Sequence, residues 1–166
     1  FITHYKNYFG AAITIYDNNS TDSSKAIIEH NGCKYIPYDS GGQIRDDIYL
    51  DIKNNCWKNS KADWVIVCDI DEFLEVDFDY SDSTILSVRG FDMVGDLNSR
   101  TGVPNKLYSK NIMFKPSEIK EINYLAGCHY SKPEGNIKFS RNVAKLLHRK
   151  YISEDYVLGR HLMYQE

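Results

Sequence analysis

Apolar and polar residues follow a regular pattern over the first half of the chain. Stretches with helical periodicity and short apolar runs succeed one another, and polar turn residues separate them. The pattern predicts a helix over 1–9, a strand over 11–16, a helix to about 30, a strand over 34–38, a longer helix after 39–42 and a strand from 64. This order is typical of parallel strands joined by right-handed crossovers.

The second half of the chain lacks this regularity. Its apolar runs are short, and glycine, proline and acidic residues interrupt them. We expect loops over 77–83, 96–104 and 131–135, strands within 84–94 and over 107–114, 122–130 and 143–148, and a final helix from Ser153. The chain as a whole is predicted to be a single α/β domain. Its central sheet would be mostly parallel and flanked by helices, with a smaller mixed or antiparallel C-terminal part.

One apolar run ends in a cluster of acidic residues. Trp64 to Cys68 has the composition of a strand buried on both faces, and Asp69, Asp71 and Glu72 follow it within four positions. Buried carboxylates are unfavourable unless a cation neutralises them. If the chain stays extended, the side chains at positions 69 and 71 point the same way. The cluster therefore predicts a magnesium or manganese site at the end of this strand.

Three other interpretations of the acidic cluster can be compared with the sequence. Acidic residues also favour a helix N-terminus, where the helix dipole stabilises negative charge. A calcium-binding EF-hand loop is excluded, because Phe73 and Leu74 stand where it requires a polar ligand and a glycine. An aspartate-nucleophile phosphatase also combines an apolar strand with Asp-x-Asp, but Phe73 stands where that family has threonine or valine. The phosphatase interpretation is kept as the alternative.

Other polar residues could contribute to a site around the acidic cluster. Asp17 and Asn19 follow the strand over 11–16 and could contact a nucleobase or ribose, although a capped turn explains them equally well. His129 and His148 close two predicted strands, and each could add an imidazole ligand to a metal. Five basic residues are candidate phosphate contacts: Arg45, Lys110, Lys132, Lys145 and Arg149.

Composition and charge narrow the class of protein. The 166 residues carry a formal net charge of -3, so the chain lacks the basic surface that nucleic-acid binding needs. No stretch holds the ~18 consecutive apolar residues of a membrane span. The 4 cysteines are widely spaced and form no Cys-x-x-Cys motif, which is typical of free thiols in a cytoplasmic protein.

Several motifs, taken in order, resemble a glycosyltransferase of the GT-A fold, and most closely the family-2-like bacterial enzymes. They are Ile15–Asp22, Lys53–Lys58, Trp64–Phe73 with its Asp-Ile-Asp-Glu-Phe, Gly127–His129, Pro133–Gly135, and Leu146–His148 leading into Tyr151. The resemblance covers nearly the whole chain. It implies a Rossmann-like domain that binds a nucleotide-diphosphosugar.

The resemblance also implies roles for individual residues. Asp71 matches the aspartate that binds the manganese or magnesium ion bridging the donor diphosphate, and Asp69 matches the one on the metal or the ribose. Asp17 matches the nucleobase contact. His148 or His129 matches a late histidine that completes the metal shell. The metal would stabilise the charge that grows on the leaving nucleoside diphosphate.

The acceptor side of such an enzyme is less clearly marked. A carboxylate base would deprotonate the acceptor hydroxyl if the enzyme inverts, and Asp96 and Glu134 are weak candidates for it. The resemblance implies a saccharide or lipid-linked acceptor and a part in bacterial surface polysaccharide synthesis. It also implies a cytoplasmic location, including the inner face of the membrane. A homo-oligomer is compatible with the sequence.

The resemblance also suggests a division of the chain. The GT-A fold normally begins with a strand upstream of the helix that contains Tyr5, so we expect a truncated domain. Residues 1–76 would form its nucleotide-binding half and 77–166 its acceptor-side half. A non-catalytic fragment that binds a partner through its tyrosine-rich surface is a further hypothesis, since the chain carries 13 tyrosines.

Overall fold

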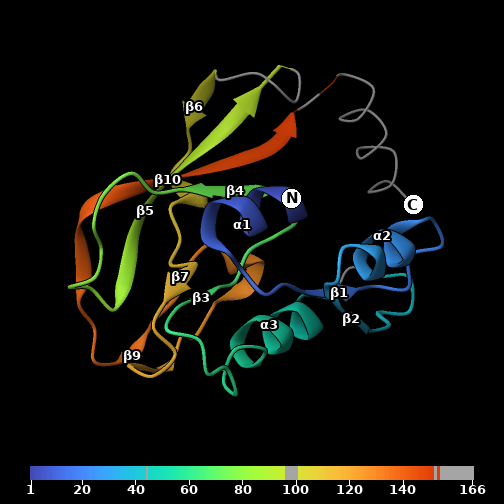
Figure 1. The fold of residues 1–166 in the computed structure, drawn as a ribbon, viewed down its shortest axis with the longest axis horizontal. Coiled ribbons are helices and arrows are strands. Elements are labelled where there is room, and N and C mark those ends of the chain that lie inside the picture. The colour runs from blue at the N-terminus through green and yellow to red at the C-terminus, as the bar shows by residue number, and fades with distance from the viewer. Residues whose placement is uncertain (44, 96–100, 152, 154–166) are drawn as a thin grey trace. The chain divides into compact units, whose positions relative to one another are not determined.

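A computed structural model describes residues 1–43, 45–95, 101–151 and 153 of the chain (Figure 1). The chain divides into two compact units, Phe1–Ile48 and Tyr49–Glu166, which are described separately. Of the described residues, 21% are helical and 34% lie in strands. Strands therefore dominate, in contrast to the helix-rich α/β domain that the sequence predicts.

The first unit contains the alternation of helices and strands expected from its apolar pattern. It has α1 (Ile2–Phe9), β1 (Thr14–Asp17), α2 (Ser24–His30) and β2 (Lys34–Pro37), and the start of α3 (Asp46–Asn55). β1 and β2 pair in parallel, with Thr14 opposite Lys34 and Asp17 opposite Pro37. These elements and this parallel pair confirm the local predictions for the first unit.

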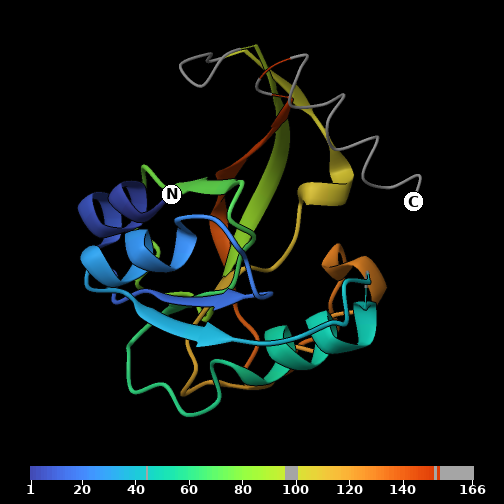
Figure 2. The same cartoon turned by 90° about the vertical axis from the view of Figure 1, so that its right-hand side faces the viewer.

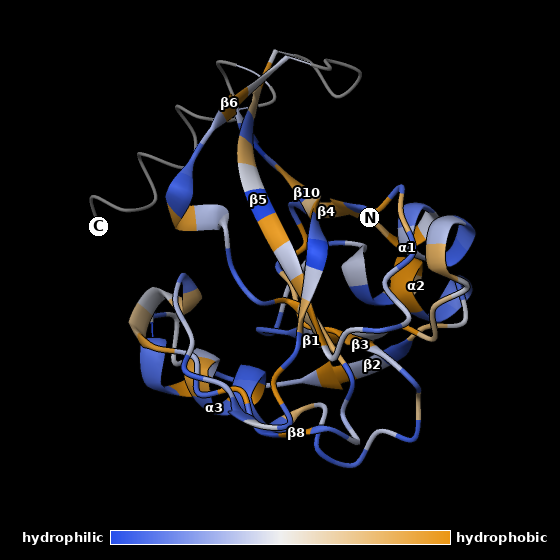
Figure 3. Cartoon of the chain, turned by 90° about the vertical axis from the view of Figure 1, so that its left-hand side faces the viewer, coloured by the Kyte–Doolittle hydropathy of each residue, from blue (hydrophilic) through white to orange (hydrophobic). Residues whose placement is uncertain are grey.

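The second unit consists mainly of strands. They are β3 (Val65–Ile66), β4 (Glu72–Glu75), β5 (Ile85–Val94), β6 (Gly102–Pro104), β7 (Met113–Phe114), β8 (Ile119–Glu121), β9 (Glu134–Gly135) and β10 (Phe139–Tyr151). Two short 3₁₀ helices, η1 (Lys106–Tyr108) and η2 (Ala126–Cys128), interrupt them. Figure 3 shows hydrophobic and hydrophilic stretches alternating along β5, as expected of a strand whose two faces differ.

Six of these strands form one mixed sheet. The order is β3-β7-β5-β10-β4, and β6 pairs with β5. β5 and β10 run side by side in parallel and curl together (Figure 2), whereas the other strand pairs of the sheet are antiparallel. β8 and β9 form a separate antiparallel pair. The sheet is therefore held together mainly by antiparallel pairing.

The predicted fold class is wrong. The described chain has a curled mixed sheet rather than the mostly parallel, helix-flanked sheet of a Rossmann-like GT-A domain. The apolar run from Trp64 contributes only β3 to a ladder, and β3 pairs antiparallel with β7 instead of with a parallel neighbour. The run is also less buried than predicted, since Val67 alone in it is buried and the other residues are half-buried. An apolar run does not identify the strand that pairs with it. The division of the chain at 76/77 is a prediction that this topology does not test.

Several element predictions in the second half also need correction. The segment 107–114 is η1 followed by β7, because Asn105 accepts a hydrogen bond from the Leu107 amide and starts a 3₁₀ turn. The segment 122–130 has one isolated bridge, from Tyr124 to Ser131, because positive φ angles at residues 123, 127 and 128 break the extended chain. β6 and β9 lie in predicted loops, and β10 is longer than the predicted 143–148. The helix expected from Ser153 falls outside the described residues.

The second unit has a hydrophobic core beside the sheet. Its buried members are Trp57, Val67, Ile85, Phe114, Ile119, Ile122, Tyr124 and Cys128, and Leu50 and Val65 pack against them. The Trp57 and Phe114 rings meet edge to face with centroids 4.9 Å apart. None of the 4 cysteines is in a disulfide, as expected. In the described part of the chain no helix combines the length and apolar character that crossing a membrane requires, in agreement with the sequence.

The register of β4, β10 and β5 aligns two rows of residues across the sheet. One row is apolar, with Leu146 opposite Leu74 on one side and Gly90 on the other. The next row is polar, with His148 opposite Glu72 and Asp92. Paired residues in neighbouring strands project from the same face of a sheet, and so do residues two apart in one strand. The buried leucines thus support the polar row.

Gly90 allows η1 to approach the sheet closely. A Cβ at this position would lie 2.4 Å from the Tyr108 carbonyl carbon. The Gly90 backbone also bonds the two residues that flank η1: its oxygen accepts from the Asn105 backbone N–H at 2.9 Å, and its N–H donates to Ser109 Oγ at 3.1 Å. Glycine at this position therefore places Tyr108 above the polar row.

We expect Gly90→Ala to lower the free energy of unfolding by about 1–3 kcal/mol, because the added methyl group overlaps backbone that cannot rotate away. Urea denaturation monitored by tryptophan fluorescence measures the change. Gly102→Ala is the matched control, since its Cβ would meet first the thioether sulfur of Met93, which can move. Equal losses for the two variants would show that the close approach of η1 is not what requires glycine.

Candidate functional site

The acidic cluster lies in a tight turn of the second unit. The Glu72 amide donates to the Asp69 carbonyl oxygen at 3.1 Å, and the Asp69 amide donates to Glu72 Oε2 at 3.0 Å. Ile70 is at the tip of this turn with 65% of its surface exposed. Because the chain turns here, the strand alternation that would aim Asp69 and Asp71 the same way does not apply. The two carboxylates contact different partners.

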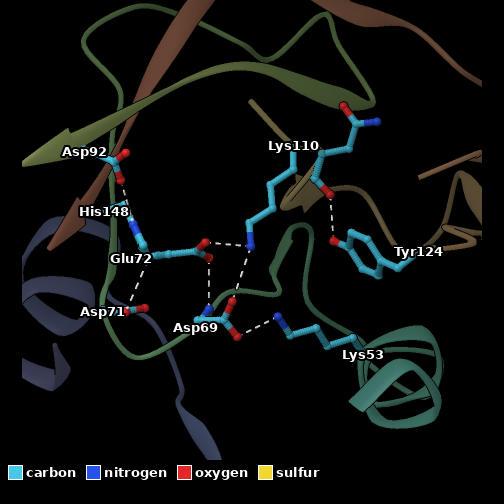
Figure 4. Close-up of polar contacts among 9 residues, drawn as sticks. Lys53, Asp69, Asp71, Glu72, Asp92, Lys110, Tyr124 and His148 are labelled. Atoms are coloured by element: carbon cyan, nitrogen blue, oxygen red, sulfur yellow. Dashed lines mark hydrogen bonds and ion pairs between the residues drawn. The ribbon is translucent and has the colours of Figure 1, made fainter. Parts of the chain in front are cut away.

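Asp69 is held by two lysines (Figure 4). Lys53 from α3 donates to Asp69 Oδ1 at 2.6 Å, and Lys110 lies 3.3 Å from Asp69 Oδ2. The Lys110 ammonium also forms an ion pair with Glu72 at 2.5 Å. The side chains of Lys110 and Glu72 are only 2% and 0% exposed, whereas that of Asp69 is 48% exposed. A buried lysine therefore joins a buried and a half-exposed carboxylate.

The charges of this network set its protonation. Desolvation alone would raise the pKa of Asp69, but the Lys53 and Lys110 ammonium groups outweigh it and hold that pKa below its usual range. Burial would likewise lower the pKa of Lys110, but Glu72 and Asp69 outweigh it and raise that pKa. Burial raises the pKa of Glu72, with a further contribution from the Asp69 charge. Asp69 is thus an anion whose two oxygens both face lysines.

Asp71 contacts a histidine on the neighbouring strand. His148 Nε2 lies 3.3 Å from Asp71 Oδ2, and His148 Nδ1 lies 3.0 Å from Asp92 Oδ1 on β5. The Tyr108 ring stacks on the imidazole with centroids 3.9 Å apart and an interplanar angle of 25°. The His148 side chain is 7% exposed. The ring is therefore fixed at both nitrogens and on one face.

The two carboxylates also determine the charge of His148. Burial would lower the pKa of this imidazole, but its hydrogen bonds to Asp71 and Asp92 outweigh burial and raise that pKa. The imidazolium form of His148 therefore faces a carboxylate at each ring nitrogen and offsets their negative charge. The lysines do the same at Asp69.

The donor atoms of Asp71 and His148 fit a divalent cation. Adjacent ligands of a magnesium ion, each at about 2.1 Å in an octahedral shell, are about 3 Å apart, which is close to the 3.3 Å between Asp71 Oδ2 and His148 Nε2. A ligating histidine usually donates its other ring N–H to a carboxylate, and Asp92 is placed to accept it. Asp69 is less suited as a ligand in this arrangement, because an ammonium group lies against each of its oxygens and would repel a divalent cation.

No group of three His, Cys, Asp or Glu side chains within the described ranges could by itself hold a metal ion. A cation at Asp71 and His148 would therefore need further oxygen ligands. Magnesium in proteins is commonly bound by one or two carboxylates together with substrate phosphates and water. The pair is thus suited to a metal that arrives with a phosphorylated ligand.

His129 is near this site but is not part of the pair. Its ring meets the edge of Tyr108 at a centroid distance of 5.4 Å, and its Nδ1 is buried without a hydrogen-bond partner. Burial lowers the pKa of His129, and the positive charge of Lys110 adds to this effect. The sequence offered His129 and His148 as equal alternatives, and the structure brings only His148 into contact with Asp71.

The nucleotide contacts predicted in the first unit are engaged within it. Asp17 is 8% exposed and accepts hydrogen bonds from the Ser20 amide at 2.9 Å, from Ser20 Oγ at 2.6 Å and from the Tyr35 hydroxyl at 3.2 Å. Asn19 is exposed, with a φ of 52°. The alternative reading of Asp17 as a turn-stabilising residue is therefore confirmed, and its nucleobase contact stays a prediction.

Two of the remaining predicted site residues contact other partners. Arg45 forms an exposed ion pair with Asp47 at 2.6 Å. Glu134 is exposed in β9 and accepts a hydrogen bond from Asn123 at 3.0 Å. Asp96 lies outside the described residues. Of the predicted phosphate contacts, Lys110 is in the cluster, but its ammonium is already engaged by two carboxylates.

Sequence reasoning missed four residues that hold the site together: Lys53, Asp92, Asn105 and Tyr108. Asp92 carried a signal, because this acid stands between Phe91 and Met93 in an otherwise apolar stretch. A carboxylate in a buried strand needs a partner. Asn105 and Tyr108 had no comparable signal, since their placement depends on the close approach of η1 to Gly90.

The sequence matched no protein-family model, and no curated protein sequence matched it.

Proposed function

We propose that this chain is a metal-dependent glycosyltransferase that transfers a sugar from a nucleotide-diphosphosugar to an acceptor hydroxyl. The observation that carries the proposal is the contact between Asp71 and His148, two residues 77 positions apart that both belong to the resembling motifs. The proposal rests on this site and on the order of the motifs. It does not rest on the sheet, whose topology differs from the predicted one.

Each charged group of the site has a role in this proposal. Asp71 and His148 would hold a manganese or magnesium ion, which stabilises negative charge on a leaving diphosphate. Lys53 and Lys110 neutralise Asp69 and Glu72, so that the acidic turn does not repel an incoming diphosphate. Asp69 thereby orients the two lysines rather than binding the metal. Of the two lysines, Lys53 is closer to solvent, because its side chain is 14% exposed whereas that of Lys110 is 2% exposed.

The acceptor side of the reaction is proposed from the motifs alone. We propose a saccharide or lipid-linked acceptor, a part in bacterial surface polysaccharide synthesis, and a cytoplasmic location that includes the inner face of the membrane. Of the two candidate bases, Glu134 is exposed, so its carboxylate could accept a proton from an acceptor hydroxyl. Transfer would then displace the nucleoside diphosphate from the anomeric carbon and leave the proton on the base.

Thermal unfolding in the presence of nucleotides tests this function. We expect UDP or GDP to raise the melting temperature when Mn²⁺ is present, and EDTA to remove the shift, because binding to the folded state stabilises it. Release of nucleoside diphosphate from a nucleotide sugar would then identify the donor. The absence of a shift with every nucleotide tested would contradict the proposal.

The same samples distinguish the alternatives. An aspartate-nucleophile phosphatase would hydrolyse p-nitrophenyl phosphate and would form a phospho-aspartate at Asp69. Lys53 and Lys110 each contact one oxygen of Asp69, and attack would use a lone pair that these contacts leave. A non-catalytic fragment would show neither turnover nor a nucleotide-dependent shift, and would instead associate with a partner or with itself.

A further inference from the structure

A chain of hydrogen bonds extends from His148 away from Asp71 (Figure 4 shows its His148 end). His148 Nδ1 lies 3.0 Å from Asp92 Oδ1, and Asp92 Oδ2 accepts from Asn105 Nδ2 at 2.7 Å. Asn105 Oδ1 in turn accepts from the Leu107 backbone N–H at 3.0 Å. Both oxygens of Asp92 and both polar atoms of the Asn105 amide therefore have partners.

The direction of every hydrogen bond in this chain follows from its last member. A backbone N–H can only donate, so the Asn105 oxygen must face Leu107 and its NH₂ group must face Asp92. The Asp92 carboxylate can only accept, so the hydrogen between Asp92 and His148 belongs to Nδ1. The Asp71 carboxylate beside Nε2 also can only accept, so the imidazolium donates from both nitrogens while no metal is bound. When the ring loses one hydrogen, we expect Nδ1 to keep its own, because Nδ1 lies 3.0 Å from Asp92 whereas Nε2 lies 3.3 Å from Asp71. The lone pair is then on Nε2.

The surroundings of His148 keep its ring in this orientation. Tyr108 stacks on one face of the imidazole, and the close approach at Gly90 fixes the backbone of Tyr108. The Asn105 backbone N–H also donates to the Gly90 carbonyl oxygen. Tyr108 in η1 thus covers His148, and Asn105, which caps the start of η1, orders Asp92 through its side-chain amide.

We propose that Asp92, ordered by Asn105, is a positioning residue that sets the tautomer of His148 and presents its Nε2 lone pair beside Asp71 to a divalent cation. This inference rests on the proposed function and deepens it, because it assigns the group that prepares one of the two protein ligands. It also predicts a property of the metal-free protein, namely the tautomer of one histidine.

Asp92→Asn tests the inference with almost no change in shape. The wild-type carboxylate accepts one hydrogen bond from His148 and one from Asn105. The new amide at position 92 has a single oxygen in place of two, so that oxygen can face only one of these two donors. If that oxygen accepts from Asn105, an NH₂ group faces Nδ1, and the ring hydrogen moves to Nε2. We expect this tautomer in the variant, and we expect Mn²⁺ affinity to fall ~10–100-fold, as is typical when the partner of a ligating histidine is changed.

The exchange Asp92→Asn with Asn105→Asp provides a rescue. The new carboxylate at position 105 still accepts from the Leu107 amide, and it also accepts from the NH₂ group of the new amide at position 92. The oxygen at position 92 is then turned back to His148. We expect this double variant to restore the hydrogen on Nδ1 and to recover most of the Mn²⁺ affinity. A residue that served only the stability of the fold would give no such rescue.

Two measurements on the full chain test the role of Asp92. ¹⁵N chemical shifts of the His148 ring report the tautomer without metal, at a pH where the ring is neutral, and His148→Gln assigns its signals. The electron paramagnetic resonance signal of free Mn²⁺ measures affinity. A tautomer that is the same in the wild type and in Asp92→Asn, or a double variant that behaves like the single one, would overturn the inference. Failure of the wild type to bind Mn²⁺ with or without UDP or GDP would overturn the proposed function instead, while the tautomer still tests Asp92.

Discussion

Asp71→Asn is expected to weaken Mn²⁺ binding by more than about 100-fold, and with it the binding of any nucleoside diphosphate that depends on the metal. Changes to groups behind a ligand typically cost ~10–100-fold in affinity, and loss of a direct carboxylate ligand should cost more. The fold should be retained, because His148 keeps its hydrogen bond to Asp92. Titration of Mn²⁺ followed by electron paramagnetic resonance measures the affinity.

Glu75→Gln is the matched control for this prediction. Glu75 lies on β4 four positions after Asp71, and its side chain is exposed. Removing its charge changes the net charge of the protein as much as Asp71→Asn does, but removes no proposed ligand. Similar Mn²⁺ affinities for the two variants would show that the cation responds to the general negative charge of this region and not to Asp71.

Lys110→Met is expected to destabilise the protein by about 3–5 kcal/mol, the usual effect of leaving a buried charge without its partner. The Lys110 ammonium is the ion-pair partner of Glu72, whose side chain is 0% exposed. Its removal forces Glu72 either to stay charged in the core or to take up a proton. Urea denaturation at neutral pH measures the loss.

Lys53→Met separates this effect from loss of charge at Asp69. Both lysines contact Asp69, but Lys53 has no ion pair with Glu72 among the described contacts. Its partner is half exposed, so the same substitution should cost about 1 kcal/mol or less. A double variant of Lys110→Met with Glu72→Gln should recover part of the stability, because it removes the unpaired charge. Equal losses for the two lysine variants would contradict the buried pair as the stabilising contact.

The sequence predicted the local elements of the first unit because they depend on near neighbours. Helical periodicity and turn residues locate α1, α2 and α3, and Gly32 follows α2 with a φ of 63°, as expected of a residue that ends a helix. Strand partners depend on distant residues. Residues 64–68 do not indicate that β3 pairs with β7. The sequence of β10 likewise does not indicate that it pairs with β5 in parallel and with β4 antiparallel. The sequence therefore predicts the helices and strands of the first unit but not the strand pairing of the mixed sheet.

The candidate site was predictable to the extent that its residues have unusual chemistry for their position. Acidic residues directly after an apolar run identified Asp69 and Asp71, and a histidine at the end of an apolar run identified His148. The sequence predicted that Asp69 and Asp71 share one metal ion. The turn at Ile70 instead separates the two carboxylates, and Asp69 contacts Lys53 and Lys110. The predicted pairing of Asp71 with His148 required the antiparallel register of β4 and β10, which only the structure supplies.

The central claim is that Asp71 and His148 bind one divalent cation together with a nucleoside diphosphate. Electron spin echo envelope modulation of Mn²⁺ bound to the protein with UDP or GDP detects a directly coordinated imidazole nitrogen. We predict a ¹⁴N coupling in the wild type that is retained in His129→Gln and lost in His148→Gln. Bound Mn²⁺ without nitrogen coupling in the wild type, or coupling that persists in His148→Gln, would contradict the account.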